Sequence, residues 1–112
     1  MQNIKPIVYA ALLNVCPRVF PIAPPDDFEE FPCVSYLEIY NAERATADDE
    51  EYVSDIDIAI DLWGETPEEL SALALSVNAE MRKIGGRRVG CQDLPPDDGV
   101  QHKNMIYNFK EV

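Results

Sequence analysis

Aliphatic and acidic side chains alternate between residues 55 and 63, and this pattern constrains the fold more than any other in the chain. The aliphatic members are Ile56, Ile58, Ile60 and Leu62, and the acidic members are Asp55, Asp57 and Asp61. Successive side chains of a strand point to opposite faces. One face of this strand must therefore join a core, while the other meets water, a partner or a channel.

Charge is distributed unevenly along the 112 residues, which we expect to form a single domain (1–112). The net charge is -12, and residues 26–69 hold sixteen carboxylates but a single basic residue, Arg44. Four basic residues lie close together near a predicted helix end: Arg82, Lys83, Arg87 and Arg88. We therefore expect a surface with separate acidic and basic regions. The net negative charge argues against tight binding of nucleic acid.

The three cysteines, Cys16, Cys33 and Cys91, are widely spaced, and the chain has one histidine. This arrangement does not indicate a disulfide framework or a zinc site, so we expect buried free thiols in a reducing cytoplasm. No signal-peptide pattern and no apolar run of transmembrane length is present. We therefore expect a soluble protein without membrane contact.

The periodicity of apolar residues predicts seven elements in the order α-β-β-β-α-β-β. The clearest prediction is a helix over 67–84. Thr66-Pro67-Glu68-Glu69 forms a capping box at its start, and Gly85-Gly86 ends it. The other elements are a helix over 4–15 and strands over 18–22, 33–40, 52–63, 87–94 and 102–112. A polar loop over 41–51 and a turn over 95–99 separate strands. This predicts an α+β fold, with an antiparallel sheet of four to five strands and two helices on one face.

Neither catalysis nor a bound cofactor is indicated. The acidic runs lack the spaced oxygen ligands and the glycine of a calcium loop, so we predict no metal site. No nucleophile with a base, and no phosphate-binding loop, accompanies Asp55, Asp57 and Asp61, so we predict that the protein is not an enzyme. A nucleophilic pair of Cys91 and His102 lacks a group to orient the histidine.

Several short patterns in this order resemble the tail-completion, or tail-terminator, proteins of long-tailed bacteriophages. The similarity spans nearly the whole chain and carries no catalytic signature. The patterns are Phe-Pro-Cys-Val-Ser-Tyr at 31–36, Ile-Asp-Ile-Ala-Ile-Asp-Leu-Trp at 56–63, Thr-Pro-Glu-Glu-Leu at 66–70, Cys-Gln-Asp-Leu at 91–94 and His-Lys-Asn-Met-Ile-Tyr-Asn-Phe at 102–109.

The resemblance implies a structural virion protein at the head–tail interface, made in the cytoplasm of a host bacterium. Such proteins form a ring, typically a hexamer, on the head-proximal end of the tail tube. The ring stops tube polymerisation and joins the tail to the head connector, or stopper, protein. DNA passes through its centre without specific binding, and no cofactor is implied.

Three groups of residues become candidates for this role. Asp55, Asp57 and Asp61 are candidate channel-lining residues, with an ordinary solvated strand face as the alternative. The candidate subunit interface comprises Arg82, Lys83, Arg87, Arg88 and Trp63, since a polarised monomer offers two unlike patches for a ring contact. The candidate loop that orders on meeting a partner comprises Asp48, Asp49, Glu50 and Glu51.

Two other functions remain open from the sequence. The net charge also permits an acidic DNA mimic that inhibits a DNA-binding enzyme, although here a basic cluster accompanies the carboxylates, which concentrate in loops. A head-completion protein of the same connector is the third reading, and it differs only in its position along the assembly.

Overall fold

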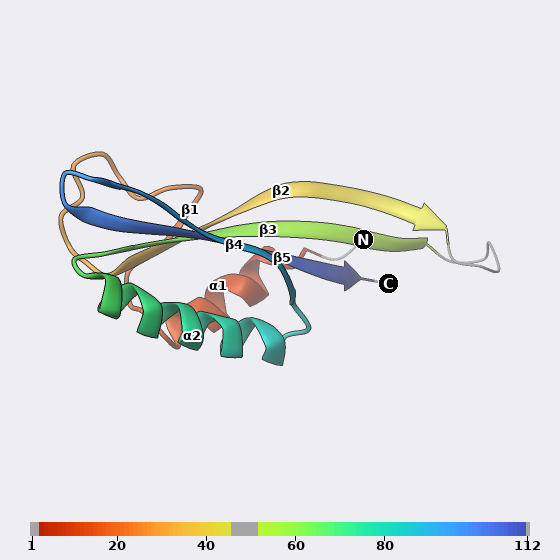
Figure 1. Cartoon of the computed structure of the whole chain (residues 1–112). Helices are drawn as coiled ribbons and strands as arrows, with labels where there is room; N and C mark the ends of the chain where they lie inside the picture. The colour runs from red at the N-terminus through yellow and green to blue at the C-terminus, as the bar shows by residue number, and fades with distance from the viewer. Residues whose placement is uncertain (1–2, 46–51, 112) are drawn as a thin grey trace.

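The computed structural model of the chain describes residues 3–45 and 52–111, and the predicted partner-ordered loop at 48–51 lies outside these ranges. The elements are α1 (Lys5–Leu13), β1 (Val19–Pro21), β2 (Cys33–Ala45), β3 (Tyr52–Gly64), α2 (Pro67–Lys83), β4 (Arg87–Asp97) and β5 (Val100–Glu111). The predicted α+β class and element order are confirmed. The molecule is elongated, about 52 × 24 × 22 Å, and both helices lie on one side of the sheet (Figure 1).

The five strands form one sheet in the order β1-β2-β3-β5-β4. Four of them are antiparallel neighbours, as predicted, whereas β1 runs parallel to β2. A parallel neighbour requires a connection that crosses back to the same end of the sheet. Residues 22–32 make that connection, which the local sequence pattern did not reveal.

The core lies between the aliphatic face of β3 and the two helices. Ile56, Ile58, Ile60 and Leu62 have no exposed surface, which confirms that this face is buried. The α2 stripe packs in the same cluster through Leu70, Leu73, Val77 and Met81, with Ala74 and Ile84 partly buried against it. Each fully buried aliphatic side chain of this kind contributes about 1.5–3 kcal/mol. The helices therefore cover one face of the sheet and leave the other face open.

Helix α2 is bounded at both ends by the residues that the sequence indicated. Thr66 Oγ1 accepts a hydrogen bond from Glu69 N at 3.1 Å, and Glu69 Oε1 accepts one from Glu65 N at 2.9 Å. At the other end Gly86 N donates to Met81 O at 2.8 Å, and Gly85 N donates to Arg82 O at 3.1 Å. Gly85 has φ of +90°, the left-handed conformation that a Schellman motif requires.

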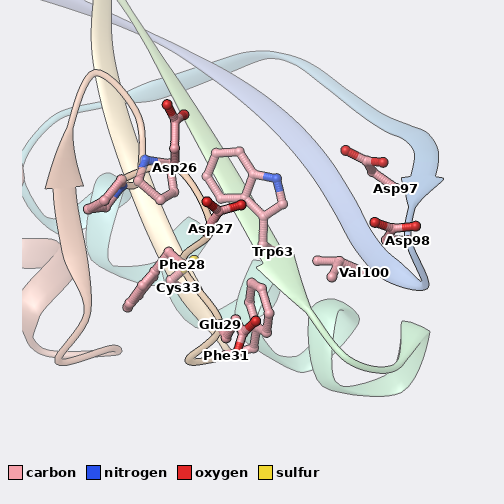
Figure 2. Close-up of a pocket in the computed structure, with 12 residues that line it drawn as sticks. Asp26, Asp27, Phe28, Glu29, Phe31, Cys33, Trp63, Asp97, Asp98 and Val100 are labelled. Atoms are coloured by element: carbon pink, nitrogen blue, oxygen red, sulfur yellow. The ribbon is translucent and has the colours of Figure 1, made fainter.

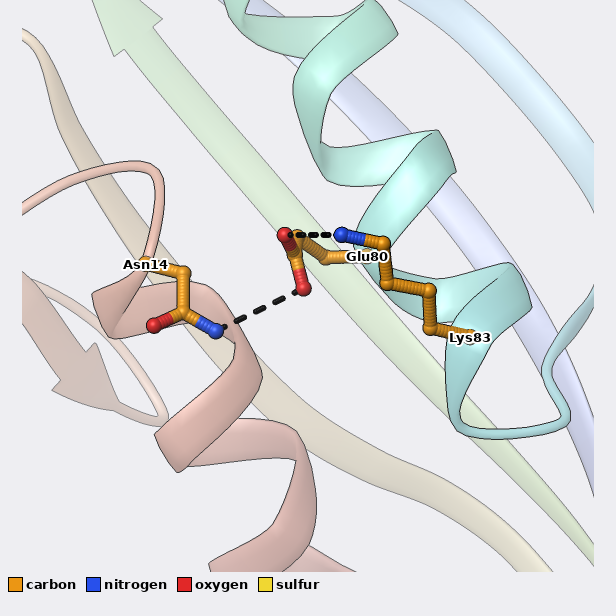
Figure 3. Close-up of polar contacts among 3 residues, drawn as sticks. All are labelled: Asn14, Glu80 and Lys83. Carbon is orange, nitrogen blue, oxygen red and sulfur yellow. Dashed lines mark hydrogen bonds and ion pairs between the residues drawn. The ribbon is translucent and has the colours of Figure 1, made fainter.

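One side chain of α2 links the two helices and pairs with Lys83, a residue of the candidate subunit interface. Glu80 Oε2 accepts a hydrogen bond from Asn14 Nδ2 of the α1 end at 3.5 Å, and Glu80 Oε1 pairs with Lys83 Nζ at 3.1 Å (Figure 3). The charge of Lys83 is therefore partly balanced within the molecule. Helix α1 itself is shorter than predicted and ends at Leu13.

The turn before β5 is tighter than the predicted loop over 95–99. Strand β4 continues through Pro95 and Pro96 to Asp97, which pairs with Val100. The connection is therefore the dipeptide Asp98-Gly99, with φ values of 50° and 79°, as in a type I′ hairpin. Strand β4 is an edge strand, so prolines without an N–H are tolerated there, next to a register shift.

The predicted loop over 41–51 begins later than expected. Residues 41–45 belong to β2 and pair with 52–56 of β3 after a register shift between Glu38 and Tyr40. A long neighbouring strand offers hydrogen-bond partners for the whole of this segment. Pairing therefore outweighs the polar composition, because strand propensity depends strongly on context.

Two of the three thiols are buried as predicted, and the third is not. Cys16 and Cys33 are 2% and 0% exposed, whereas Cys91 is exposed on the edge strand β4. The prediction for Cys91 is wrong because it lies on this edge strand, where no residue is fully buried. Among the described helices, none is long and apolar enough to cross a membrane.

Replacing Thr66 by alanine tests the capping geometry. Thr66→Ala removes the acceptor for Glu69 N and should lower the free energy of unfolding by about 1 kcal/mol. Urea denaturation followed by circular dichroism measures this. Thr66→Ser keeps the hydroxyl and should lose much less. Equal losses in the two variants would contradict the capping role.

Candidate functional site

The open face of the sheet carries the acidic residues of β3, and β5 supplies their partners. Asp61 Oδ1 accepts a hydrogen bond from Asn104 Nδ2 at 3.1 Å and lies 2.9 Å from His102 Nε2. Asn108 Nδ2 donates to Asp57 Oδ1 at 2.8 Å and to Asp55 Oδ1 at 3.1 Å. These carboxylates are thus half-buried and tied across strands, not merely solvated.

Strand register brings these groups together. Asp57 is in register with Asn108, Asp61 with Asn104 and Trp63 with His102. Directly opposed side chains in an antiparallel pair lie on the same face at close range. Asn104 and Asn108 were not among the residues predicted for this face. The signal was present, because His102, Asn104 and Asn108 fall at even positions of β5, between the core residues Met105, Tyr107 and Phe109 at odd positions.

A row of apolar side chains separates the two acidic parts of this face. Leu37, Ala59 and Ile106 stand side by side on β2, β3 and β5, and Gly90 of β4 completes the row. Ala59 is 6% exposed and Leu37 is 38% exposed. The open face is therefore amphipathic, with polar rows on either side of an apolar one.

Trp63 lies on the open face, where its indole stacks on His102. The ring centroids are 4.6 Å apart with an interplanar angle of 15°. The side chain is half-buried and lines a pocket beneath residues 22–32, where Figure 2 shows it between Asp26 and Asp27 on one side and the hairpin turn on the other. Trp63 is thus placed for contact with another molecule, although that role stays a prediction.

The four predicted interface cations form a corner, not a patch on one face. Arg82, Lys83, Arg87 and Arg88 are all exposed at the α2–β4 connection. Arg87 shares a row with Asn108 and so belongs to the open face. We call these four residues the basic corner. Their role as a subunit interface stays a prediction.

Arg88 lies on the helix side of this corner, near Tyr107. Burial raises the pKa of the Tyr107 hydroxyl to about 12, although the nearby charges of Arg88 and Arg82 oppose the shift. The hydroxyl donates to Asn78 Oδ1 at 2.8 Å. Tyr107 is thus a neutral structural group, and it links β5 to α2 beneath the basic corner.

The described part of the chain offers little to a nucleophilic mechanism. Burial raises the pKa of the Cys33 thiol to about 11, so it stays protonated near neutral pH. Cys91 is in register with Met105, a core residue, whereas His102 stacks on Trp63 of the open face. Cys91 and His102 therefore lie on opposite faces and do not pair. Within residues 3–45 and 52–111, no group of three or more metal-ligating side chains is arranged to hold an ion.

Comparison with known proteins gives a likeness in fold. No protein-family model matches the chain, and a search of curated proteins finds no match. Among solved structures, the chain resembles a chain of the structure described as the virion of a native gene transfer agent particle, with 16% sequence identity and a TM-score of 0.56. The match covers 93% of this chain and 90% of the other. The two chains share a fold. The likeness extends over nearly the whole of each.

Replacing Asn108 by aspartate tests the cross-strand network. Asn108→Asp removes the donor shared by Asp55 and Asp57 and adds a third carboxylate beside them. We expect the free energy of unfolding at pH 7 to fall by about 1–3 kcal/mol. Like charges raise carboxyl pKa values in the folded state, so this loss is present at high pH and disappears as the carboxylates protonate.

Urea denaturation at pH 7 and at acidic pH measures both effects. The matched control is Asn41→Asp, because Asn41 donates to Glu38 at 3.3 Å at an exposed position. At that position the same substitution should change the free energy of unfolding by no more than about 0.5 kcal/mol. A loss for Asn108→Asp that does not depend on pH would contradict the electrostatic explanation.

Proposed function

We propose that this protein is a structural component of a phage-like virion that forms a ring on the head-proximal end of a tail tube. There it stops tube polymerisation and joins the tail to the head connector. The observation that carries the proposal is the fold shared, over nearly its whole length, with a chain of a gene transfer agent virion. The resemblance of the sequence patterns to tail-terminator proteins supports the specific position.

A ring requires each subunit to present two different surfaces, one to each neighbour. The molecule offers unlike surfaces: a basic corner at the α2–β4 connection, where β4 begins, and carboxylates near the other end of β4, along residues 22–32 and at the β4–β5 turn. Complementary charges of this kind fix orientation and speed encounter more than they add affinity. The distribution of charge therefore supports a head-to-tail arrangement.

The open face is our candidate for the wall of the DNA channel. Asn104 and Asn108 donate hydrogen bonds to the carboxylates and leave their charge in place. Lys110 and Arg87 lie in the rows of Asp55 and Asp57, so we expect the negative potential to be strongest beside Asp61. Such a wall repels phosphates within a Debye length of roughly 8–10 Å and lets DNA pass without binding.

Mass photometry of the purified protein over a range of concentrations tests the ring. We expect closed oligomers of one size, and negative-stain images should show the same rings capping tubes of the cognate tail-tube protein. Addition of the protein during tube assembly should shorten the tubes. A monomer at every concentration that neither caps tubes nor shortens them would overturn the proposal. Tight one-to-one binding to a DNA-binding enzyme, reversed by DNA, would favour the mimic instead.

Charge reversal on the open face tests the channel wall. Asp55→Lys with Asp57→Lys should leave the ring intact and slow DNA ejection several-fold, because lysines bind phosphates as DNA passes. Ejection from particles complemented with the variant is followed with a DNA-binding dye. Glu65→Lys with Glu68→Lys, at exposed positions off this face, is the matched control. Normal ejection in the first variant would place these carboxylates outside the channel.

A further inference from the structure

A pocket with a volume of about 570 Å³ lies at the end of the open face, beneath residues 22–32 (Figure 2). Three aromatic residues contribute to its wall: Phe28 and Phe31 from that connection and Trp63 from β3. The pocket belongs neither to the core nor to the acidic rows described above.

The walls of the pocket are held in place by packing. Phe28 meets Phe20 of β1 edge to face, with centroids 4.8 Å apart, and it lies 6.5 Å from Phe31. Arg18 Nε anchors the end of the connection by donating to Pro32 O at 2.8 Å. His102 holds Trp63 by stacking, as described above. The pocket is thus formed before any partner arrives, which lowers the entropy loss on binding.

The rim of the pocket is acidic. Five carboxylates line it: Asp26, Asp27, Glu29, Asp97 and Asp98. None of their side chains forms a hydrogen bond or ion pair with another residue in the described part of the chain. Aromatic rings and carboxylates together favour a cationic side chain, since ring faces attract cations and a guanidinium matches a carboxylate in a bidentate pair. Phosphates and neutral ligands fit this rim poorly.

The chain itself carries a matching group. Arg82, Arg87 and Arg88 of the basic corner are exposed, and their side chains form no hydrogen bond or ion pair among the described residues. Arg87 lies in the row of Asn108 and Asp57, six residues along β3 from Trp63. At about 3.3 Å per residue this is roughly 20 Å, too far for an arginine to reach within one subunit.

We propose that the basic corner of a second copy of this chain docks in the aromatic pocket, with Arg87 or Arg88 between the rings and the acidic rim. This inference rests on the proposed ring and names its contact. The two surfaces are different, so the contact is heterologous and repeats around a ring. Because exposed charges form the rim, high salt weakens the contact.

Charge reversal on each side tests the docking. The pocket variant is Asp26→Lys with Asp97→Lys, and the corner variant is Arg87→Glu with Arg88→Glu; all four residues are exposed. Each variant alone should lower the association constant by about tenfold or more. An equimolar mixture should recover association, because each variant then meets a partner of opposite charge. The matched control, Glu30→Lys with Glu65→Lys, changes exposed carboxylates outside the pocket.

Two readouts separate this inference from the ring itself. Mass photometry reports closure, and the emission of Trp63, the one tryptophan of the chain, reports occupancy of the pocket. Emission that changes with concentration in the wild type, but not in the corner variant, supports docking even if no ring closes. Rings that form normally in the pocket variant overturn the docking and leave the ring proposal standing. Wild-type protein with neither rings nor an emission change overturns both.

Discussion

The two faces of β3 are the constraint on which the rest of the structure depends. This strand is third of five in the sheet, so both neighbours take their register from it. A slip of one residue would turn its carboxylates into the core and its aliphatic side chains to the outside. Each buried carboxylate without a partner would cost several kcal/mol. The packing of Ile56, Ile58 and Ile60 against α2 therefore also fixes where Asp55, Asp57 and Asp61 stand.

On the open face, asparagine amides donate hydrogen bonds to the carboxylates of β3. A half-buried carboxylate needs hydrogen-bond donors, and lysine or arginine would supply them while cancelling its charge. Asn104 and Asn108 supply donors and preserve the charge of Asp57 and Asp61. His102 adds a donor that also supports the indole of Trp63. A stable fold and a negatively charged face are compatible for this reason, and the proposed channel wall depends on both.

The sequence alone predicted α2 and the buried face of β3. Capping residues and the alternation of side chains are local features, which depend only on residues close together in the chain. Pairing between distant segments was harder to predict. The parallel addition of β1 depends on how residues 22–32 return to β2, and the continuation of β4 through Pro95 and Pro96 depends on its position at the sheet edge. The turn over 95–99 was predicted as a longer loop, although Asp98-Gly99 is the dipeptide that a type I′ hairpin favours. Prediction of the asparagine hydrogen bonds and of the pocket below residues 22–32 requires knowing which residues pair across the strands. The periodicity of the sequence does not give that pairing.

The carboxylates around the pocket make the proposed contact between subunits electrostatically favourable. Asp26, Asp27 and Asp97 line the same pocket and form no ion pair within the described residues, so we expect their mutual repulsion to disfavour the isolated subunit. An arginine from a neighbour removes that repulsion and gains attraction at the same time. Salt screens both effects, so it favours the separate subunit by stabilising it and by weakening the contact. The acidic rim thus opposes the isolated state and favours assembly at low ionic strength, whereas an apolar pocket of the same shape would favour assembly at any salt concentration.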